Sequence, residues 1–278
     1  MEKYRLSAFA DEYADSFEEQ CVALKNFGYK NIEIRGVDGK NVSTLTDEEV
    51  ALVKRTLDKY GLGVSSIGSP IGKIKLDGDL GAHFEMAEKV FKTAKYLGAK
   101  NVRIFSFYIP DGMEREDCKD KVLSLLSRLI DLAEKYQVTL CHENEALIYG
   151  ESDDSCLELL TYFKGRLKCV FDMGNFVLDG YNPFVAYLKL YDYIEYFHIK
   201  DALYAGAIVP AGKGEAEIEK ILADYKSKNE GYFITLEPHL QTFSGLNALV
   251  GKTFDNPYKY ENQQVAFTDA VKHLEKIL

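Results

Sequence analysis

The feature that most constrains the fold is a pattern that recurs along the chain: a helical stretch, then a glycine, then a short run rich in β-branched residues. Glycine just after a helix supplies the left-handed backbone conformation that other residues adopt only at a cost. The recurring glycines are Gly28, Gly61, Gly98, Gly165 and Gly231. Helix starts are marked as well, by capping-box patterns that open at Ser16 and Thr46 and by Asn182 before Pro183.

This pattern predicts eight strands, each followed by a helix. We expect the strands at residues 5–9, 31–35, 63–67, 101–105, 138–143, 167–171, 193–198 and 232–236. Eight βα units of about 35 residues each favour one (β/α)8 TIM barrel, an α/β fold that spans residues 1–278 as a single catalytic domain. A doubly wound open sheet is the alternative. It usually carries a phosphate-binding loop after its first strand, which this sequence lacks.

Alternation within the strands predicts which side chains face the barrel interior. Apolar pairs such as Ile32 and Ile34 are expected to pack under the helices. The opposite face is polar and carries Ser7, Glu33, Arg35, Ser66, Arg103, Thr139, Glu143, Asp172, His198 and Glu237. Parallel strands covered on both faces are normally apolar, and buried polar groups are costly unless they pair or bind something. We therefore expect a site inside the barrel, at the carboxyl ends of the strands.

Four residues at the ends of strands five to eight share the same phase: Glu143, Asp172, His198 and Glu237. A single acidic residue at a strand end is usually a solvated loop residue, but four on consecutive strands predict one shared point. Three carboxylates and an imidazole suit one divalent metal ion. The oxygen-rich set favours Mn²⁺ or Mg²⁺, and the imidazole leaves Zn²⁺ and Co²⁺ open.

Several segments around these residues resemble a known family. They are Glu143-Asn144, Asp172-Met-Gly174, His198-x-Lys200-Asp201, Gly212-Lys-Gly-Glu215 and Leu236-Glu237. They resemble the xylose isomerase-like TIM-barrel superfamily of sugar and sugar-phosphate isomerases and epimerases, which also contains inosose dehydratases and AP endonucleases. The resemblance spans essentially the whole chain. It implies that Glu143, Asp172, His198 and Glu237 hold a catalytic divalent metal, and that Glu143 and Glu237 exchange protons with the substrate.

The expected activity is therefore isomerisation or epimerisation of a small sugar, polyol or sugar phosphate through a metal-stabilised enediolate. A carboxylate on each side of the reacting carbon removes a proton from one face and returns one to the other, which is epimerisation. Delivery of the proton to the adjacent carbon by the same base is aldose–ketose isomerisation.

Residues expected to bind substrate surround this set: Asn175, Lys200, Asp201, His239, Arg35, Ser66 and Lys213. Lys200 matches a family position near the substrate, and Asn175 stands where ketose 3-epimerases of the family carry histidine. For His239, substrate contact and an ordinary loop role remain equal alternatives. Arg35 is expected either to pair with Glu33 as an internal buttress or to reach a substrate hydroxyl.

The glycine-rich segment around Lys213 offers backbone N–H groups for a phosphate or carboxylate. Three other histidines are expected to be structural. His142 is one residue out of phase with Glu143 and should point to the helical layer or the rim of the barrel. His83 and His273 are predicted to lie on helix surfaces.

Composition limits the partners. The chain has 34 Lys and Arg residues against 44 Asp and Glu residues, a formal net charge of −10. This balance disfavours a general binder of nucleic acid or anionic membranes. No apolar run approaches the length of a membrane span, and no signal-peptide core precedes Asp11. Five scattered cysteines without a C-x-x-C motif suggest free thiols and a cytoplasmic location. Homo-oligomerisation stays open.

Three alternative functions remain. A dehydratase would use the same site to expel a β-hydroxyl from the enediolate. A non-catalytic sugar-binding barrel would keep the ligands without turnover. An AP endonuclease would need a cluster of three metals with many histidines, and this chain has five histidines and an acidic charge.

Overall fold

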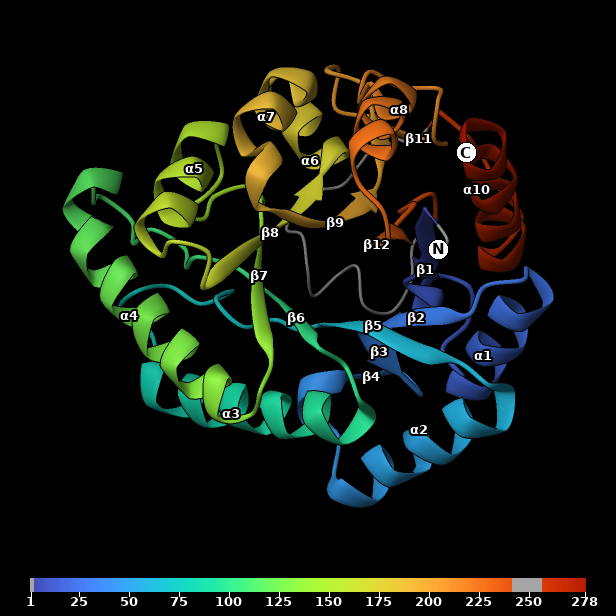
Figure 1. Cartoon of the computed structure of the whole chain (residues 1–278), viewed down its shortest axis with the longest axis horizontal. Coiled ribbons are helices and arrows are strands. Elements are labelled where there is room, and N and C mark those ends of the chain that lie inside the picture. The colour runs from blue at the N-terminus through green and yellow to red at the C-terminus, as the bar shows by residue number, and fades with distance from the viewer. Residues whose placement is uncertain (1–2, 242–256) are drawn as a thin grey trace.

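The computed structural model describes residues 3–241 and 257–278. In this part of the chain, eight parallel strands form a nearly closed ring with helices around it (Figure 1). The strands are β1 (Tyr4–Ala8), β2 (Asn31–Ile34), β5 (Gly63–Gly68), β6 (Asn101–Ile104), β7 (Thr139–Glu143), β8 (Leu167–Asp172), β9 (Ile194–Ile199) and β12 (Tyr232–Leu236). The predicted (β/α)8 barrel is confirmed, and every predicted strand agrees to within one residue at each end.

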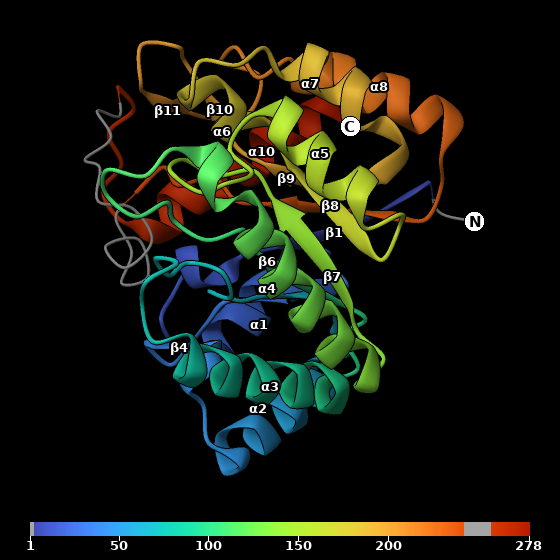
Figure 2. The ribbon, with the colours of Figure 1, turned by 90° about the vertical axis from the view of Figure 1, so that its left-hand side faces the viewer.

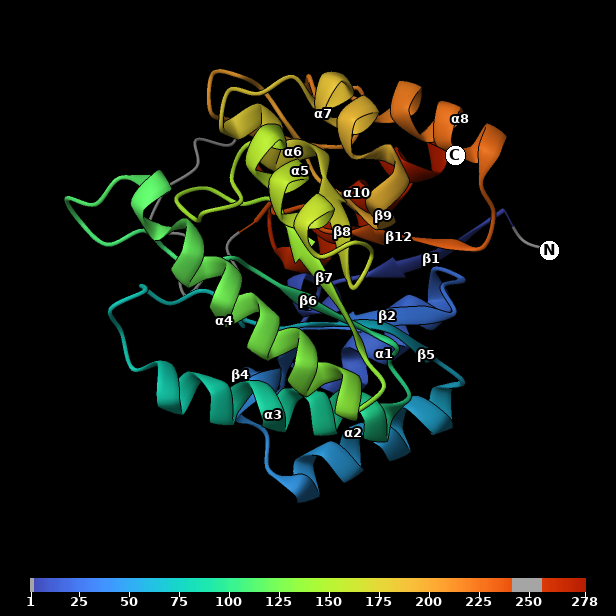
Figure 3. The ribbon, with the colours of Figure 1, turned by 60° about the vertical axis from the view of Figure 1, so that its left-hand side comes forward.

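Helices form the outer layer. Those of the described ranges are α1 (Phe17–Asn26), α2 (Asp47–Tyr60), α3 (Leu80–Leu97), α4 (Arg115–Lys135), α5 (Asp153–Tyr162), α6 (Met173–Leu178), α7 (Pro183–Leu190), α8 (Ile218–Lys228) and α10 (Gln263–Ile277). Figure 3 shows α3 and α4 crossing the outer side of the barrel next to each other. Within these ranges, none of the helices combines the length and the apolar character needed to cross a lipid bilayer.

The helix boundaries follow from local chemistry. Thr46 caps α2 with a complete capping box: its hydroxyl accepts the N–H of Glu49 at 3.3 Å, and the Glu49 carboxylate accepts the N–H of Thr46 at 2.8 Å. Asn182 caps α7, whose first residue is Pro183. Gly61 and Gly98 end α2 and α3 with left-handed φ angles of 69° and 80°.

Short elements extend the barrel at the carboxyl ends of its strands. Hairpin β3 (Gly36–Val37) and β4 (Lys40–Asn41) follows β2, and hairpin β10 (Asp201–Ala202) and β11 (Ile208–Val209) follows β9. Figure 2 shows β4, β10 and β11 on the side of the molecule away from the N-terminus. The described ranges also contain three 3₁₀ turns: η1 (Ala10–Glu12), η2 (Val42–Thr44) and η3 (Tyr191–Tyr193).

The core has two separate apolar layers. The larger layer lies between strands and helices and includes Ile32 and Ile34, as the alternation predicts. The smaller layer lies apart from it and consists of Cys141, Val170 and Tyr196, with Phe233 packed against them. All five cysteines are buried and free.

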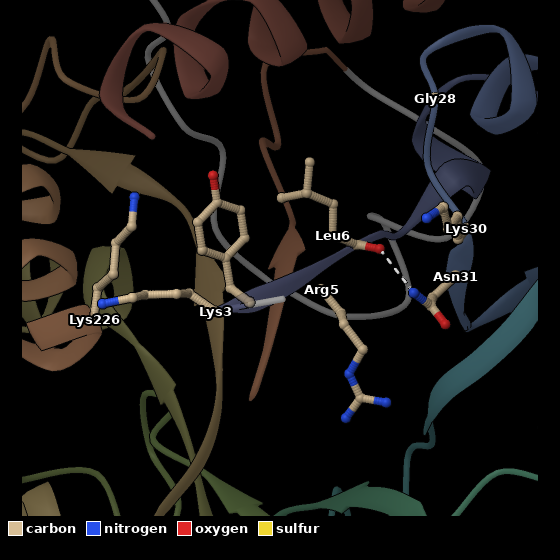
Figure 4. Close-up of a pocket in the computed structure, with 8 residues that line it drawn as sticks. Lys3, Arg5, Leu6, Gly28, Lys30, Asn31 and Lys226 are labelled. Atoms are coloured by element: carbon tan, nitrogen blue, oxygen red, sulfur yellow. Dashed lines mark hydrogen bonds between the residues drawn. The ribbon is translucent and has the colours of Figure 1, made fainter. Parts of the chain in front are cut away.

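Strands β1 and β2 are neighbours in the ring but are held together by side chains and not by a backbone ladder. We call this junction the seam. Among the described residues, backbone ladders connect β1 to β12 and continue around the ring to β2, without a ladder between β2 and β1. Side chains bridge this seam instead. The Asn31 amide of β2 donates to the carbonyl of Leu6 in β1 at 3.3 Å (Figure 4). Ser65 of β5 links the same two strands, because its hydroxyl lies 2.6 Å from that of Ser7 in β1 and donates to the Ile32 carbonyl of β2 at 3.1 Å.

Candidate metal centre

Four buried side chains converge where the sequence predicts a metal site. Glu143 ends β7, Asp172 ends β8, His198 lies in β9 and Glu237 follows β12. The register pairs Asp172 with His198 on neighbouring strands. One nitrogen or oxygen atom from each of the four residues lies within 4.8 Å of the corresponding atoms of the others.

Each of the two glutamates is held between an arginine and His198. Arg103 Nη1 donates to Glu143 Oε2 at 3.1 Å, and Arg35 Nη1 donates to Glu237 Oε1 at 2.7 Å. The other carboxylate oxygens face His198 Nδ1, at 2.6 Å from Glu143 Oε1 and 3.1 Å from Glu237 Oε2. Buried ion pairs of this kind fix the orientation of both carboxylates.

The charges around the glutamates set their ionisation. Burial alone raises the pKa of Glu143, but His198 and Arg103 outweigh it and lower the pKa to about 2. For Glu237, Lys200 and His198 likewise overcome burial and hold the pKa well below its usual value. Both glutamates are therefore carboxylates at neutral pH.

Asp172 is the exception among the carboxylates. Its Oδ2 accepts a hydrogen bond from Lys200 Nζ at 2.8 Å, and its Oδ1 accepts the N–H of Asn175 at 2.8 Å. Burial nevertheless raises the pKa of Asp172 to about 7, against the attraction of Lys200, and the charges of Glu143 and Glu237 add to the increase. Burial thus disfavours the ionised form of Asp172 more than Lys200 stabilises it.

These properties fit a divalent cation. The donor set of three carboxylates and one imidazole is buried and compact, and these are donor types that divalent cations bind in proteins. Glu143, Asp172, His198 and Glu237 are the residues whose atoms are placed to hold it.

Comparison with known proteins assigns the family. Residues 21–258 match the family model of the xylose isomerase-like TIM barrel. The chain belongs to the xylose isomerase-like TIM-barrel family. This confirms the resemblance inferred from the sequence. No curated protein matches the chain significantly.

Solved structures show the same barrel. D-allulose 3-epimerase from Methylomonas sp., in complex with D-allulose, has 18% identity and a TM-score of 0.75, with 100% of this chain and 97% of that chain covered. The IolI protein with a bound zinc atom has 17% identity and a TM-score of 0.75, with coverage of 98% and 97%. The probable 3-DHS dehydratase AsbF from Bacillus anthracis has 17% identity and a TM-score of 0.73, with coverage of 98% for both chains. At these identities the similarity establishes the fold.

In this xylose isomerase-like barrel, Arg35 has partners other than the one expected. Its guanidinium binds both oxygens of Asp11, at 2.9 and 3.0 Å, and Glu12 at 3.1 Å, in addition to Glu237. The expected pairing with Glu33 is wrong. Glu33 lies two residues earlier on β2, about 6.6 Å further along the strand, and therefore points deeper into the barrel than Arg35.

His239 lies against Glu237 on the other side of this network. Its Nε2 is 3.3 Å from Glu237 Oε1 and 3.4 Å from Glu12 Oε1. Burial lowers the pKa of His239 to about 3 and raises the pKa of Glu12 to about 8. Glu12, His239 and Glu237 also bring three donor atoms together, but Arg35 pairs with both carboxylates and already supplies the cation there.

The glycine-rich segment differs from the expectation. Both oxygens of the Asp201 carboxylate accept backbone N–H groups, from Gly212 at 2.8 Å, Gly214 at 2.9 Å and Ala216 at 3.1 Å. The N–H groups predicted to hold a substrate anion are thus occupied by the protein's own carboxylate, and Lys213 is exposed. Asp201 is accordingly a loop anchor and not one of the converging residues.

Two further predictions about neighbouring residues have different outcomes. His142 points to the helical layer as expected, with Nε2 3.0 Å from the Ser106 hydroxyl, and burial lowers its pKa to about 4. The surface placement of His83 is wrong: it is buried, and its Nε2 accepts the N–H of Gly72 at 2.8 Å. The loop before α3 folds back over the helix and covers this histidine.

A basic pocket lies at the opposite end of the barrel. Lys3, Arg5, Lys30 and Lys226 line a cavity of about 450 Å³ beside the first residues of β1 and β2 (Figure 4). Two of these side chains bind main-chain oxygens: Arg5 donates to Gly231 at 2.6 Å, and Lys226 to Leu278 at 3.1 Å. The pocket is therefore separate from the candidate metal centre, and its geometry is explained by contacts within the fold.

Proposed function

We propose that this chain is a divalent-metal-dependent isomerase or epimerase that acts on a small sugar, polyol or sugar phosphate. The observation that carries the proposal is the pair of buried, ionised glutamates, Glu143 and Glu237, each held by its own arginine and both facing His198. The similarity of the barrel to a solved D-allulose 3-epimerase supports it.

Glu143, Asp172, His198 and Glu237 are assigned as the metal ligands. A bound divalent cation, whether Mn²⁺, Mg²⁺, Co²⁺ or Zn²⁺, supplies Lewis acidity that stabilises the negative charge developing on substrate oxygens as a proton leaves carbon. One similar structure, that of the IolI protein, carries zinc.

Glu143 and Glu237 are assigned as the acid/base pair. Strands β8 and β9 separate β7 from β12 in the ring, so the two carboxylates reach the centre from different sides. One ionised glutamate accepts the proton next to a substrate carbonyl, and the other, after it takes up a proton from solvent, returns that proton to the opposite face. Arg103 and Arg35 orient the two carboxylates during this exchange.

Lys200 and His239 are assigned to substrate oxygens. Lys200 Nζ lies 3.5 Å from Glu237 Oε2 and His239 Nε2 lies 3.3 Å from Glu237 Oε1, so both border the proposed base. Asn175 positions Lys200, because the Asn175 Oδ1 accepts a hydrogen bond from Lys200 Nζ at 3.0 Å. Arg35 and Ser66 are assigned supporting roles, since the polar atoms of each bind other side chains of the barrel.

Solvent deuterium exchange tests this proposal. Protein stripped with a chelator and reloaded with Mn²⁺ is incubated in D₂O with ketoses, aldoses, inososes and their phosphate esters, and NMR detects deuterium on the carbon beside the carbonyl. We expect metal-dependent exchange that Glu143→Gln reduces by about 100-fold or more. Glu134→Gln, on the outer surface of α4, serves as the matched control and should retain exchange.

Other results would redirect the assignment. Exchange retained by Glu143→Gln would refute its role as base. A product that has lost water would indicate a dehydratase on the same site, the activity named for the similar AsbF structure. Saturable binding of a sugar without exchange would indicate a non-catalytic sugar-binding barrel.

A further inference from the structure

A row of polar side chains lies behind His198, deeper in the barrel than the candidate ligands. Glu33 and Ser66 face each other in the register of β2 and β5. The Tyr196 hydroxyl donates to Glu33 Oε1 at 2.9 Å and lies 2.9 Å from Ser66 Oγ. All three side chains are fully buried.

This row ends on the second ring nitrogen of His198. Glu33 Oε2 lies 3.1 Å from Nε2, whereas Nδ1 faces Glu143 and Glu237. The two nitrogens of one imidazole therefore meet two different environments. The hydrogen bond made by one ring nitrogen decides which tautomer the histidine adopts and which nitrogen can bind a cation.

We propose that Glu33 is a positioning residue that accepts the Nε2–H of His198 and so presents Nδ1 to the divalent cation. The inference rests on the metal site assigned under the proposed function. Tyr196 in turn orients Glu33 by occupying its other oxygen. A carboxylate that binds the distal N–H of a ligating histidine fixes the ring and increases the basicity of the ligating nitrogen.

The surroundings of Glu33 favour this role over that of a general structural acid. Among the described residues, His198 is the basic side chain within ion-pair distance of Glu33, while Arg103 acts on it from farther away. A buried carboxylate is costly unless hydrogen bonds compensate it, and for Glu33 the bonds to His198 and Tyr196 do so. The ring plane of His198 is also fixed by edge contacts with Phe9 and Tyr196, at centroid distances of 5.1 and 5.4 Å.

Calorimetric titration with Mn²⁺ separates positioning from mere stability. Metal-free wild-type protein and Glu33→Gln are titrated at a temperature where both are folded. We expect Glu33→Gln to bind Mn²⁺ about 10- to 100-fold more weakly. Asp201→Asn is the matched control: it alters a buried carboxylate that anchors a loop, and it should lower stability without changing Mn²⁺ affinity.

Two further measurements keep the test decisive. Nitrogen-15 NMR of the Zn²⁺-loaded wild type should show the proton of His198 on Nε2, and in Glu33→Gln this signal should broaden or move. Tyr196→Phe keeps the carboxylate and should weaken Mn²⁺ binding by a smaller factor, which provides a readout if Glu33→Gln does not fold.

The outcomes distinguish the two proposals. Wild-type affinity for Mn²⁺ in both variants, with an unchanged histidine spectrum, would overturn the role of Glu33. Wild-type protein that binds Mn²⁺ but never exchanges a substrate proton would refute the proposed enzyme activity and leave the positioning role standing. Wild-type protein that binds neither Mn²⁺ nor Zn²⁺ would overturn both the proposed function and the role of Glu33.

Discussion

Arg35 Nη1 lies 2.7 Å from Glu237 Oε1, so a residue that follows the second strand of the barrel orients a carboxylate that follows the last one. The same guanidinium binds Asp11 and Glu12 in the turn after β1. Three segments that are distant in sequence are thus joined at one buried cation. The arrangement links the stability of the barrel to the geometry of its candidate site.

Replacing Arg35 by methionine should therefore destabilise the protein strongly. Loss of the guanidinium leaves buried carboxylates without their cation, and breaking a buried ion pair in this way costs about 3–5 kcal/mol. Urea unfolding of Arg35→Met against wild type measures the loss. Arg166→Met is the control, because Arg166 is 42% exposed beside Asp131 and Glu134 and such surface pairs contribute about 0–1 kcal/mol. Equal losses in the two variants would contradict this interpretation.

Gly174→Ala should disturb both the start of α6 and Lys200. A Cβ at this position would lie 2.8 Å from the main-chain oxygen of Lys200 and 2.7 Å from its Cγ. Such overpacking typically costs about 1–3 kcal/mol. We expect a lower thermal midpoint and, because Lys200 is displaced from Asp172, slower deuterium exchange into substrate. An unchanged midpoint would show that the backbone relaxes at this point without loss.

His83 should make stability depend on pH. Burial lowers its pKa below the usual value of 6.5, so the unfolded chain binds the proton more readily than the folded protein. Its contribution to stability is therefore complete above about pH 6.5 and declines as the pH falls below that value. Glutamine can accept the N–H of Gly72 without titrating, so His83→Gln should lose less stability than wild type between pH 7 and pH 5. Urea midpoints at the two pH values test this, and parallel losses would refute it.

Asp201→Asn should loosen the segment that it anchors. An asparagine presents one acceptor oxygen and an NH₂ group to the N–H donors of Gly212, Gly214 and Ala216, so at least one buried donor loses its partner. The cost of such a loss is about 1–3 kcal/mol. Hydrogen exchange at these three amides should accelerate while exchange in the barrel strands changes little. Full protection in the variant would show that the loop is held by other contacts.

The strands and the four converging residues were predictable because both depend on short-range periodicity. A glycine after each helix and a period of two within each strand locate Glu143, Asp172 and His198 without any tertiary information. Glu12 was missed as a neighbour of Glu237 because it lies in a 3₁₀ turn, where side-chain direction has no simple period. Glu33 was predicted to face inward, but its contact with His198 depends on the closure of the ring.

The errors concern polar groups with several available partners. Sequence alone does not decide whether Arg35 pairs with Glu33 or with Asp11 and Glu12, because the choice depends on depth along the barrel axis. The backbone N–H groups near Lys213 do bind an anion, as expected. This anion is the carboxylate of Asp201 in the same chain and not a substrate. His83 is buried by a loop whose path has no local signature in the sequence.

The seam between β1 and β2 is the place where we expect the barrel to open first. Peptide hydrogen bonds tie the other neighbouring strands of the ring together. The seam is held by side chains instead: Asn31 binds Leu6, Ser65 of β5 binds both Ser7 and the Ile32 carbonyl, and Arg35 pairs with Asp11 and Glu12. Thermal fluctuations of the barrel should begin there, as a slight separation of β1 from β2. Glu143, Asp172 and His198 sit on the unbroken arc, and so keep their mutual spacing while the seam opens and recloses.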